Sequence, residues 1–291
     1  MRDRVQEIVL RQMQAMESKV FEVGLFKPGA KAEMLLRTWD SDALIESIPW
    51  LKFQNVDGRN IYIRPKGEHS LSLVDDLTAA SLDRMKHSGF TPAVIVETSP
   101  DNFQAWLNHG RDLPKDTSTA AARALAEKFG GDPGSADWRH FGRLASFSNR
   151  KPKYEFAGRY PFVRLLHSTG EVYERAADFV SEIERRVEAQ RVEAEHRRDR
   201  YMKNVTRGKA TPAKGIEAFR NDPRYAGDGN RIDLAYAVYA LSHRVPEDEV
   251  RRTIASRDLT KKGTAEKQAD YIERTLEKAL RTVGVEECRG R

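Results

Sequence analysis

The chain has 291 residues, of which 39% are apolar and 32% charged, so it can bury the core of one large domain or of one larger and one smaller domain. Fifty Lys and Arg residues against 44 Asp and Glu residues give a formal charge of +6, which permits a polyanionic partner without requiring one. A single cysteine excludes an intrachain disulfide and a cysteine-rich zinc site, and no segment approaches the roughly 20 consecutive apolar residues of a transmembrane helix.

Helical and extended patterns alternate irregularly in the amino-terminal part of the chain. Apolar residues at helical spacing predict a first helix over residues 3–18, and its charged sequence lacks the apolar run of a signal peptide. We therefore expect a soluble, cytoplasmic protein whose first part is a mixed sheet covered by helices. The other predicted helices cover residues 41–48, 79–88 and 101–109, and the predicted strands cover residues 20–25, 33–38, 60–64, 71–75 and 93–98.

The rest of the chain changes from mixed to helical patterns. Residues 117–129 are rich in alanine and predict a helix that ends at Gly130 and Gly131, and residues 160–167 predict one more strand. Residues 172–206 form one polar helical pattern, which is typical of a helix that bridges two domains through solvent. From these patterns we expect a large domain over residues 1–174, a connector helix over residues 175–210 and a helix bundle over residues 211–291.

Acidic residues follow apolar runs at three places in the first domain. Asp75 and Asp76 close one predicted strand, Glu97 closes another, and Asp132 stands in a turn after the alanine-rich helix. Neighbouring side chains of a strand point to opposite faces, so Asp75 and Asp76 can share a metal ion only where the strand ends and the chain turns. Taken alone, each acid also fits an ordinary strand end or turn.

A cationic, donor-rich segment follows Asp132. Such side chains suit a triphosphate, because enzymes of phosphoryl transfer work mainly by positioning and by stabilising charge. Aromatic residues lie between them and can either stack on bases or pack in a core. The polar residues are Arg139, His140, Arg143, Asn149 and Lys151, and the aromatic ones are Trp138, Phe141 and Phe147.

A set of short motifs runs through nearly the whole chain in one order. Each is weak alone, and together they resemble the RepB-type DNA primase of mobilisable IncQ plasmids, within the archaeo-eukaryotic primase-like superfamily. The motifs are NIYIRP (60–65), LVDDL (73–77), VETSP (96–100) with QAW (104–106), DP (132–133) with SAD (135–137), RH (139–140), GRL (142–144), F-x-NRK (147–151) and ADYIERT (269–275).

The resemblance implies a fold and an activity. The fold is an α/β (α+β) primase-like catalytic domain over residues 1–174, followed by the connector helix and an all-α helix bundle. The activity is that of a DNA primase, a nucleotidyltransferase that makes short primers on single-stranded DNA during plasmid replication, with Mg²⁺ or Mn²⁺ as cofactor. The catalytic, metal-binding carboxylates carry over to Asp75, Asp76 and Asp132, with Glu97 held back as an outer or structural acid.

The resemblance also implies binding residues and partners. His140, Arg143 and Lys151 carry over as ligands of nucleotide phosphates or template, with Arg139 and Asn149 beside them. Where the wider group has Pro-Gly in this segment, the present chain has Ala145-Ser146. The implied partners are a single-stranded DNA template with an origin hairpin, nucleoside triphosphates, a plasmid helicase, an initiator and the host DNA polymerase, but no membrane.

Two other interpretations stay open. The chain can be a non-catalytic replication initiator that binds an origin, with acids that only terminate strands, or the primase portion of a relaxase–primase fusion. No segment reads G-x-x-x-x-G-K-[ST], which argues against an ATPase or a helicase within the chain.

Overall fold

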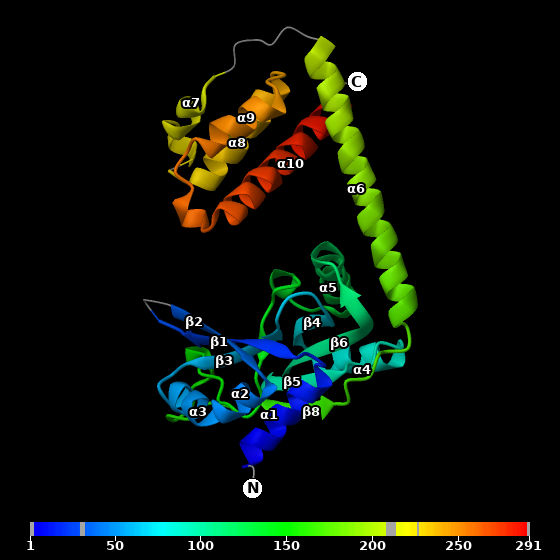
Figure 1. The fold of residues 1–291 in the computed structure, drawn as a ribbon, viewed down its shortest axis with the longest axis vertical. Coiled ribbons are helices and arrows are strands. Elements are labelled where there is room, and N and C mark those ends of the chain that lie inside the picture. The colour runs from blue at the N-terminus through cyan, green and yellow to red at the C-terminus, as the bar shows by residue number, and fades with distance from the viewer. Residues whose placement is uncertain (1–2, 30–32, 208–213, 226, 290–291) are drawn as a thin grey trace. The chain divides into compact units, whose positions relative to one another are not determined.

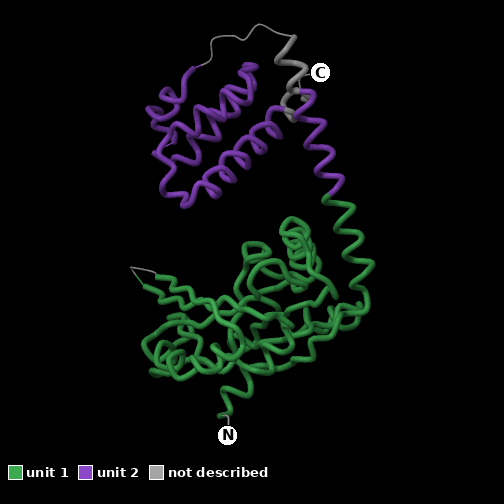
Figure 2. Tube along the Cα trace, in the orientation of Figure 1, with its two compact units in different colours: residues 1–187 green, residues 188–291 purple. Residues whose placement is uncertain are grey.

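The computed structural model describes residues 3–29, 33–207, 214–225 and 227–289. The chain divides into two compact units, residues 1–187 and residues 188–291 (Figure 2). Within the described ranges no helix has both the length and the apolar character that crossing a membrane requires.

The first unit contains two four-stranded sheets (Figure 1). In one sheet the order is β2 (Glu33–Asp40), β1 (Val20–Lys27), β3 (Asn60–Pro65) and β7 (Gly142–Arg143). In the other it is β4 (His69–Leu77), β6 (Asn102–Leu113), β5 (Val94–Ser99) and β8 (Arg164–Ser168).

The α/β fold class is confirmed, but the expected single mixed sheet is replaced by two sheets whose paired strands are all antiparallel. Short connections account for the direction of two of these pairings. β1 and β2, like β5 and β6, are joined by links of only a few residues, and a parallel pair needs a crossover of about a dozen residues or more.

The helix predicted over residues 101–109 is wrong, because this segment belongs to β6. β6 lies between β4 and β5, and both of its faces are covered, so residues 103–109 are all buried. A strand buried on both faces loses the alternation of apolar and polar residues and cannot be told from a buried helix by its pattern.

Helices cover the sheets and build two hydrophobic clusters. One cluster packs α1, α2 and α3 against the first sheet and one face of the second, and the other packs α4 and α5 against the opposite face of the second sheet. Sheet β4-β6-β5-β8 is therefore the buried centre of this unit. The helices are α1 (Arg4–Ala15), α2 (Ser41–Glu46), α3 (Ile48–Val56), α4 (Ala79–His87) and α5 (Lys115–Phe129).

A buried histidine lies within the same centre. His109 of β6 shares hydrogen bonds with Ser72 Oγ (2.8 Å from Nε2) and with the Tyr173 hydroxyl (2.9 Å from Nδ1). Burial lowers the pKa of His109 to about 3, so the ring is neutral at physiological pH.

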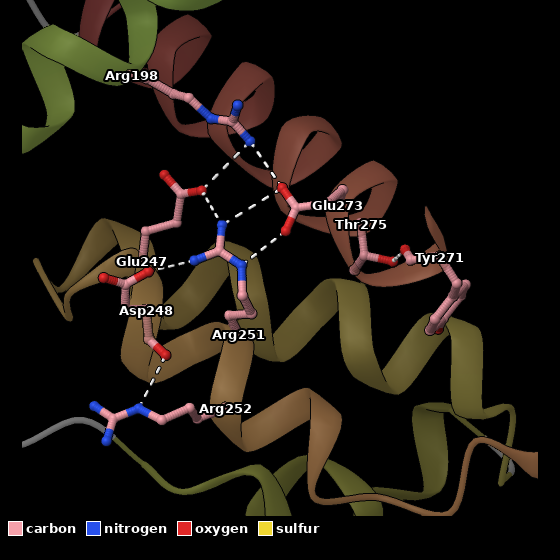
Figure 3. Close-up of polar contacts among 8 residues, drawn as sticks. All are labelled: Arg198, Glu247, Asp248, Arg251, Arg252, Tyr271, Glu273 and Thr275. Carbon is pink, nitrogen blue, oxygen red and sulfur yellow. Dashed lines mark hydrogen bonds and ion pairs between the residues drawn. The ribbon is translucent and has the colours of Figure 1, made fainter. Parts of the chain in front are cut away.

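The second unit is helical. Its core joins α7 (Ile216–Arg220), α8 (Gly229–Ser242), α9 (Glu247–Ala255) and α10 (Ala265–Arg289), and α6 (Ala176–Arg207) extends into it from the first unit. Figure 3 shows an ionic network that ties α9 to α10. Arg251 donates to Glu247 (2.8 Å) and Glu273 (2.7 Å) and pairs with Asp248, and Arg198 of α6 contacts Glu273 at 3.1 Å.

Candidate functional site

Asp75 and Asp76 lie at an irregularity near the end of β4. The register between β4 and β6 shifts between Val74 and Leu77, and Asp76 adopts a left-handed backbone with φ of 57°. The Asp76 backbone N–H donates to Asp75 Oδ1 at 2.8 Å. A bulge thus supplies the change of direction that two adjacent acids need before both can serve one site.

Asp132 is brought to this bulge by the end of α5. Gly130 caps the helix with φ of 76°, and the backbone N–H of Asp132 donates to the Asp75 carbonyl at 3.0 Å. A Cβ on Gly131 would lie 2.5 Å from Val74 Cγ1 and 3.0 Å from the Asp75 carbonyl oxygen, so only glycine allows this close approach. The two acidic segments are therefore in direct backbone contact.

The Asp75 carboxyl group is half-buried. Burial raises its pKa, while hydrogen bonds from the Gln104 side chain and the Asp76 backbone and the charge of His140 act in the opposite direction. A carboxylate whose pKa is raised by burial in a polar site is a common mark of a functional position, because a bound cation would relieve the desolvation.

The three carboxylates do not converge on one point. The Asp76 side chain accepts a hydrogen bond from Asn102 at 3.0 Å, and Asp132 accepts from Gly134 N (2.8 Å) and Ser135 Oγ (2.7 Å). Among the described residues no group of three His, Cys, Asp or Glu side chains is arranged to hold a metal ion. The oxygen donors nevertheless have the chemistry that Mg²⁺ and Mn²⁺ prefer.

Arg143 and Asn149 lie beneath the surface. The Arg143 side chain is 2% exposed and donates to Asn60 Oδ1 at 2.5 Å and to Asn149 Oδ1 at 2.9 Å, with its guanidinium over the Tyr62 ring. Asn149 is 1% exposed and donates to the Thr98 carbonyl at 2.8 Å. In this structure both side chains are hydrogen-bonded inside the domain and do not face solvent.

His140 and Lys151 lie closer to the acids. The pKa of Asp132 is lowered, mainly by the hydrogen bonds from Ser135 and Gly134, with further contributions from the charges of His140 and Lys151. The Lys151 side chain is exposed and His140 is half-buried. Arg139 is also exposed, and its carbonyl accepts a hydrogen bond from Arg64.

The remaining sequence candidates have structural contacts. Glu97 forms an ion pair with Arg164 at 2.9 Å, and Phe147 is part of the core. Trp138 lies under Lys115, and Phe141 lies under Arg64. These placements favour packing for Phe147 and a structural ion pair for Glu97.

Sequence reasoning gave no role to the polar residues that hold the acids. Gln104 bonds to Asp75 and accepts from the Arg143 backbone N–H at 2.7 Å, and Asn60 binds Arg143. The sequence signal was weak, because Asn60 opens β3 and Gln104 lies in a segment that also contains Asn102 and Asn108; both amides are buried, where an amide needs a partner.

The segment that departs from the primase pattern keeps an unusual backbone. Ser146 stands where the pattern has glycine, and it has φ of 73°, in the left-handed region that favours glycine. Its backbone N–H donates to the Val163 carbonyl at 2.9 Å, which holds the loop in place.

Comparisons with known proteins agree on one family. The family model described as RepB DNA-primase N-terminal domain matches residues 11–192. A mobilization protein A from Escherichia coli is 33% identical over 295 residues, covering 96% of this chain but only 41% of that protein. The chain therefore spans less than half the length of this curated relative.

Two solved structures are similar as well. The catalytic domain of primase RepB′ in complex with initiator DNA is 38% identical, covers 65% of this chain and 98% of its own, and superposes with a TM-score of 0.60. The structure of primase RepB′ is 31% identical, covers 99% of this chain and all of its own, and has a TM-score of 0.64.

Proposed function

The chain belongs to the RepB DNA-primase family, and from this premise we propose that it synthesises short primers on single-stranded DNA in plasmid replication. The chemistry is nucleotidyl transfer, in which a 3′-hydroxyl attacks the α-phosphorus of a nucleoside triphosphate and pyrophosphate leaves. The observation that carries the proposal is the hydrogen bond from Asp132 N to the Asp75 carbonyl, because it joins the acidic segments of two distant parts of the chain.

We propose that Asp75, Asp76 and Asp132 would hold Mg²⁺ or Mn²⁺ once Asp76 and Asp132 release the hydrogen bonds that engage their carboxylates in this structure. The oxygen donors and the raised pKa of Asp75 support this assignment, since a buried carboxylate gains most from a nearby cation. Ions held there would offset the charge of the triphosphate and would lower the pKa of the attacking hydroxyl. Before binding, Asn102 and Ser135 hold two of the three carboxylates in place.

The binding residues expected from the motifs divide into two groups. We assign phosphate binding to His140 and Lys151, whose charges act on the acids, and to the exposed Arg139. Arg143 and Asn149 are positioning residues, because their mutual hydrogen bond fixes the segment that carries Lys151. This narrows the phosphate-binding set expected from the motifs to three side chains.

The organisation of the chain follows from the same proposal. Residues 1–174 form the catalytic domain, residues 175–210 the connector and residues 211–291 a helix bundle that holds template or the initiating nucleotide. The RepB′ catalytic domain solved with initiator DNA supports template binding by the first domain. A plasmid helicase, an initiator and the host polymerase are proposed partners in the cytoplasm.

Primer synthesis by the full chain tests the proposal against the non-catalytic alternative. The assay contains a single-stranded origin fragment, labelled nucleotides of either sugar type, and Mg²⁺ or Mn²⁺. We expect short labelled products that disappear when the metal is chelated. Binding of the origin strand without any product under all these conditions would instead support an initiator that only binds DNA.

A further inference from the structure

Residues 150–164 form a loop of unusual composition, here called the basic-aromatic loop. It contains five Lys or Arg residues, one acid and four aromatic residues. The proposed function uses only Lys151 of this set. The basic residues are Arg150, Lys151, Lys153, Arg159 and Arg164, and the aromatic ones are Tyr154, Phe156, Tyr160 and Phe162.

The two arms of the loop are held together by backbone hydrogen bonds. Asn149 N donates to the Pro161 carbonyl at 2.8 Å, Val163 N donates to the Phe147 carbonyl at 2.9 Å, and Ser148 and Phe162 form an antiparallel bridge. At the base, Asn149 is bonded to buried Arg143. The base of the loop is thus hydrogen-bonded to Arg143, one of the residues around the proposed catalytic acids.

The tip of the loop is a tight two-residue turn. Phe156 and Arg159 exchange two backbone hydrogen bonds of 2.9 Å each, and the intervening Ala157 and Gly158 have φ of 49° and 74°. Positive φ at both central residues is the signature of a type I′ hairpin, whose twist matches that of the flanking arms. The turn fixes the backbone direction of Phe156 and Arg159.

Two aromatic rings stay exposed on this fixed loop. Phe156 is 83% exposed and Phe162 is 55% exposed, and neither belongs to a hydrophobic cluster of the described residues. By contrast, Tyr160 lies under the Arg150 guanidinium and donates to Glu155 at 2.7 Å. Exposed rings on an ordered scaffold can accept stacked bases, whatever the base identity.

The charge of the loop complements a phosphate backbone. Lys151, Lys153 and Arg159 are exposed. The base of the loop adjoins the residues around the proposed catalytic acids, because Asn149 is bonded to Arg143, whose backbone N–H donates to Gln104. Exposed rings interleaved with cations are the combination that single-stranded nucleic acids recognise.

We infer that the basic-aromatic loop binds the single-stranded DNA template, with bases on Phe156 and Phe162 and phosphates on Lys153 and Arg159. The inference rests on the proposed primase function, for which it supplies a template path. It assigns these four residues to affinity for the strand and not to nucleotide selection, because stacking and phosphate contacts do not read base edges.

The test measures binding of a fluorescein-labelled thymidine oligonucleotide of about 16 nucleotides to the full chain, without metal or nucleotide. Phe156→Ala and Phe162→Ala should each weaken binding about tenfold, which equals about 1.4 kcal/mol. The double variant Lys153→Ala/Arg159→Ala should reduce the slope of log affinity against log salt by about 1.4, or about 0.7 for each phosphate that the variant no longer neutralises.

Matched controls separate the loop from general surface effects. Phe53→Ala removes a ring that is 67% exposed on α3, and Lys86→Ala removes an exposed charge on α4, so both should bind like the wild type. Phe156→Trp should retain binding, and the added indole should be quenched by DNA. Unchanged melting temperatures check that the variants fold.

The outcomes distinguish this inference from the proposed function. If the wild type binds DNA and the loop variants bind less, but no primer is ever made, the function fails and the loop assignment stands. If the wild type makes primers and the loop variants bind the oligonucleotide as tightly as Phe53→Ala does, the loop serves another purpose and the inference is overturned.

Discussion

Gly131→Ala should disable the candidate site without touching any of its acids. The new Cβ would stand 2.5 Å from Val74 Cγ1 and 3.0 Å from the Asp75 carbonyl oxygen, whereas carbon contacts are most favourable at about 3.5–4.0 Å. The segment that carries Asp132 must therefore move by about 1 Å. The backbone conformation itself is no obstacle, because Gly131 does not have a positive φ.

Two effects of different size follow from this displacement. Overpacking of this kind costs about 1–3 kcal/mol of unfolding free energy, which leaves the domain folded. A misplacement of about 1 Å in a catalytic constellation can cost about 10²-fold in rate. We therefore expect primer synthesis to fall about a hundredfold at a temperature where the variant is still fully folded.

The assay is primer synthesis compared with thermal unfolding of the same preparation. Gly215→Ala is the matched control, because a Cβ at Gly215 meets no atom within 4 Å and its φ is −65°. Wild-type primer synthesis by Gly131→Ala would contradict the claim that contact between the two acidic segments sets up the site.

Three more predictions concern separate parts of the chain. Asp75→Ala should abolish primer synthesis while leaving DNA affinity within about twofold, because phosphate contacts dominate affinity. Glu97→Gln should retain primer synthesis. Equal losses of synthesis in the two variants would refute the assignment of Asp75 to the metal site. The pKa of His109 is about 3 in the folded protein and about 6.5 in the unfolded chain, so the unfolded chain takes up a proton first as the pH falls. The contribution of His109 to the free energy of unfolding should therefore be fully present above pH 6.5 and should fall by up to about 1.4 kcal/mol per pH unit below it. Urea titrations should show a smaller slope for His109→Gln. Arg251→Ala should destabilise the helical unit by about 1–2 kcal/mol in denaturant unfolding, because it removes three ion-pair partners at once; an unchanged midpoint would show that the network contributes nothing.

Sequence patterns predicted the elements whose two faces differ. The first helix and the alanine-rich helix before Gly130 were anticipated, because each combines a periodic pattern with a distinct end. β4 was anticipated as a strand, but it continues through Asp75 and Asp76 to Leu77. β6 was missed for the opposite reason, since both of its faces are buried. The number of sheets and the relative direction of their strands depend on long-range pairing, which no local pattern encodes.

The sequence predicted the acids of the candidate site but not the buried polar residues around them. The order of motifs singled out Asp75, Asp76 and Asp132, and the structure joins the segments that carry them through one backbone hydrogen bond. The sequence could not show that Arg143 and Asn149 are buried, because a charged or amide side chain in a hydrophilic segment is normally solvated. The burial of Arg143 depends on Asn60, a partner distant in the chain.

The backbone at Asp76 limits how this site can change. A left-handed conformation costs a residue other than glycine about 1 kcal/mol, and aspartate and asparagine tolerate it better than most. A β-branched residue or a bulky one is therefore disfavoured at this position on steric grounds alone, before any loss of activity is considered. Among acids, glutamate lacks the short side chain that eases this conformation, so evolution and protein design both have very little freedom at the second acid of the pair.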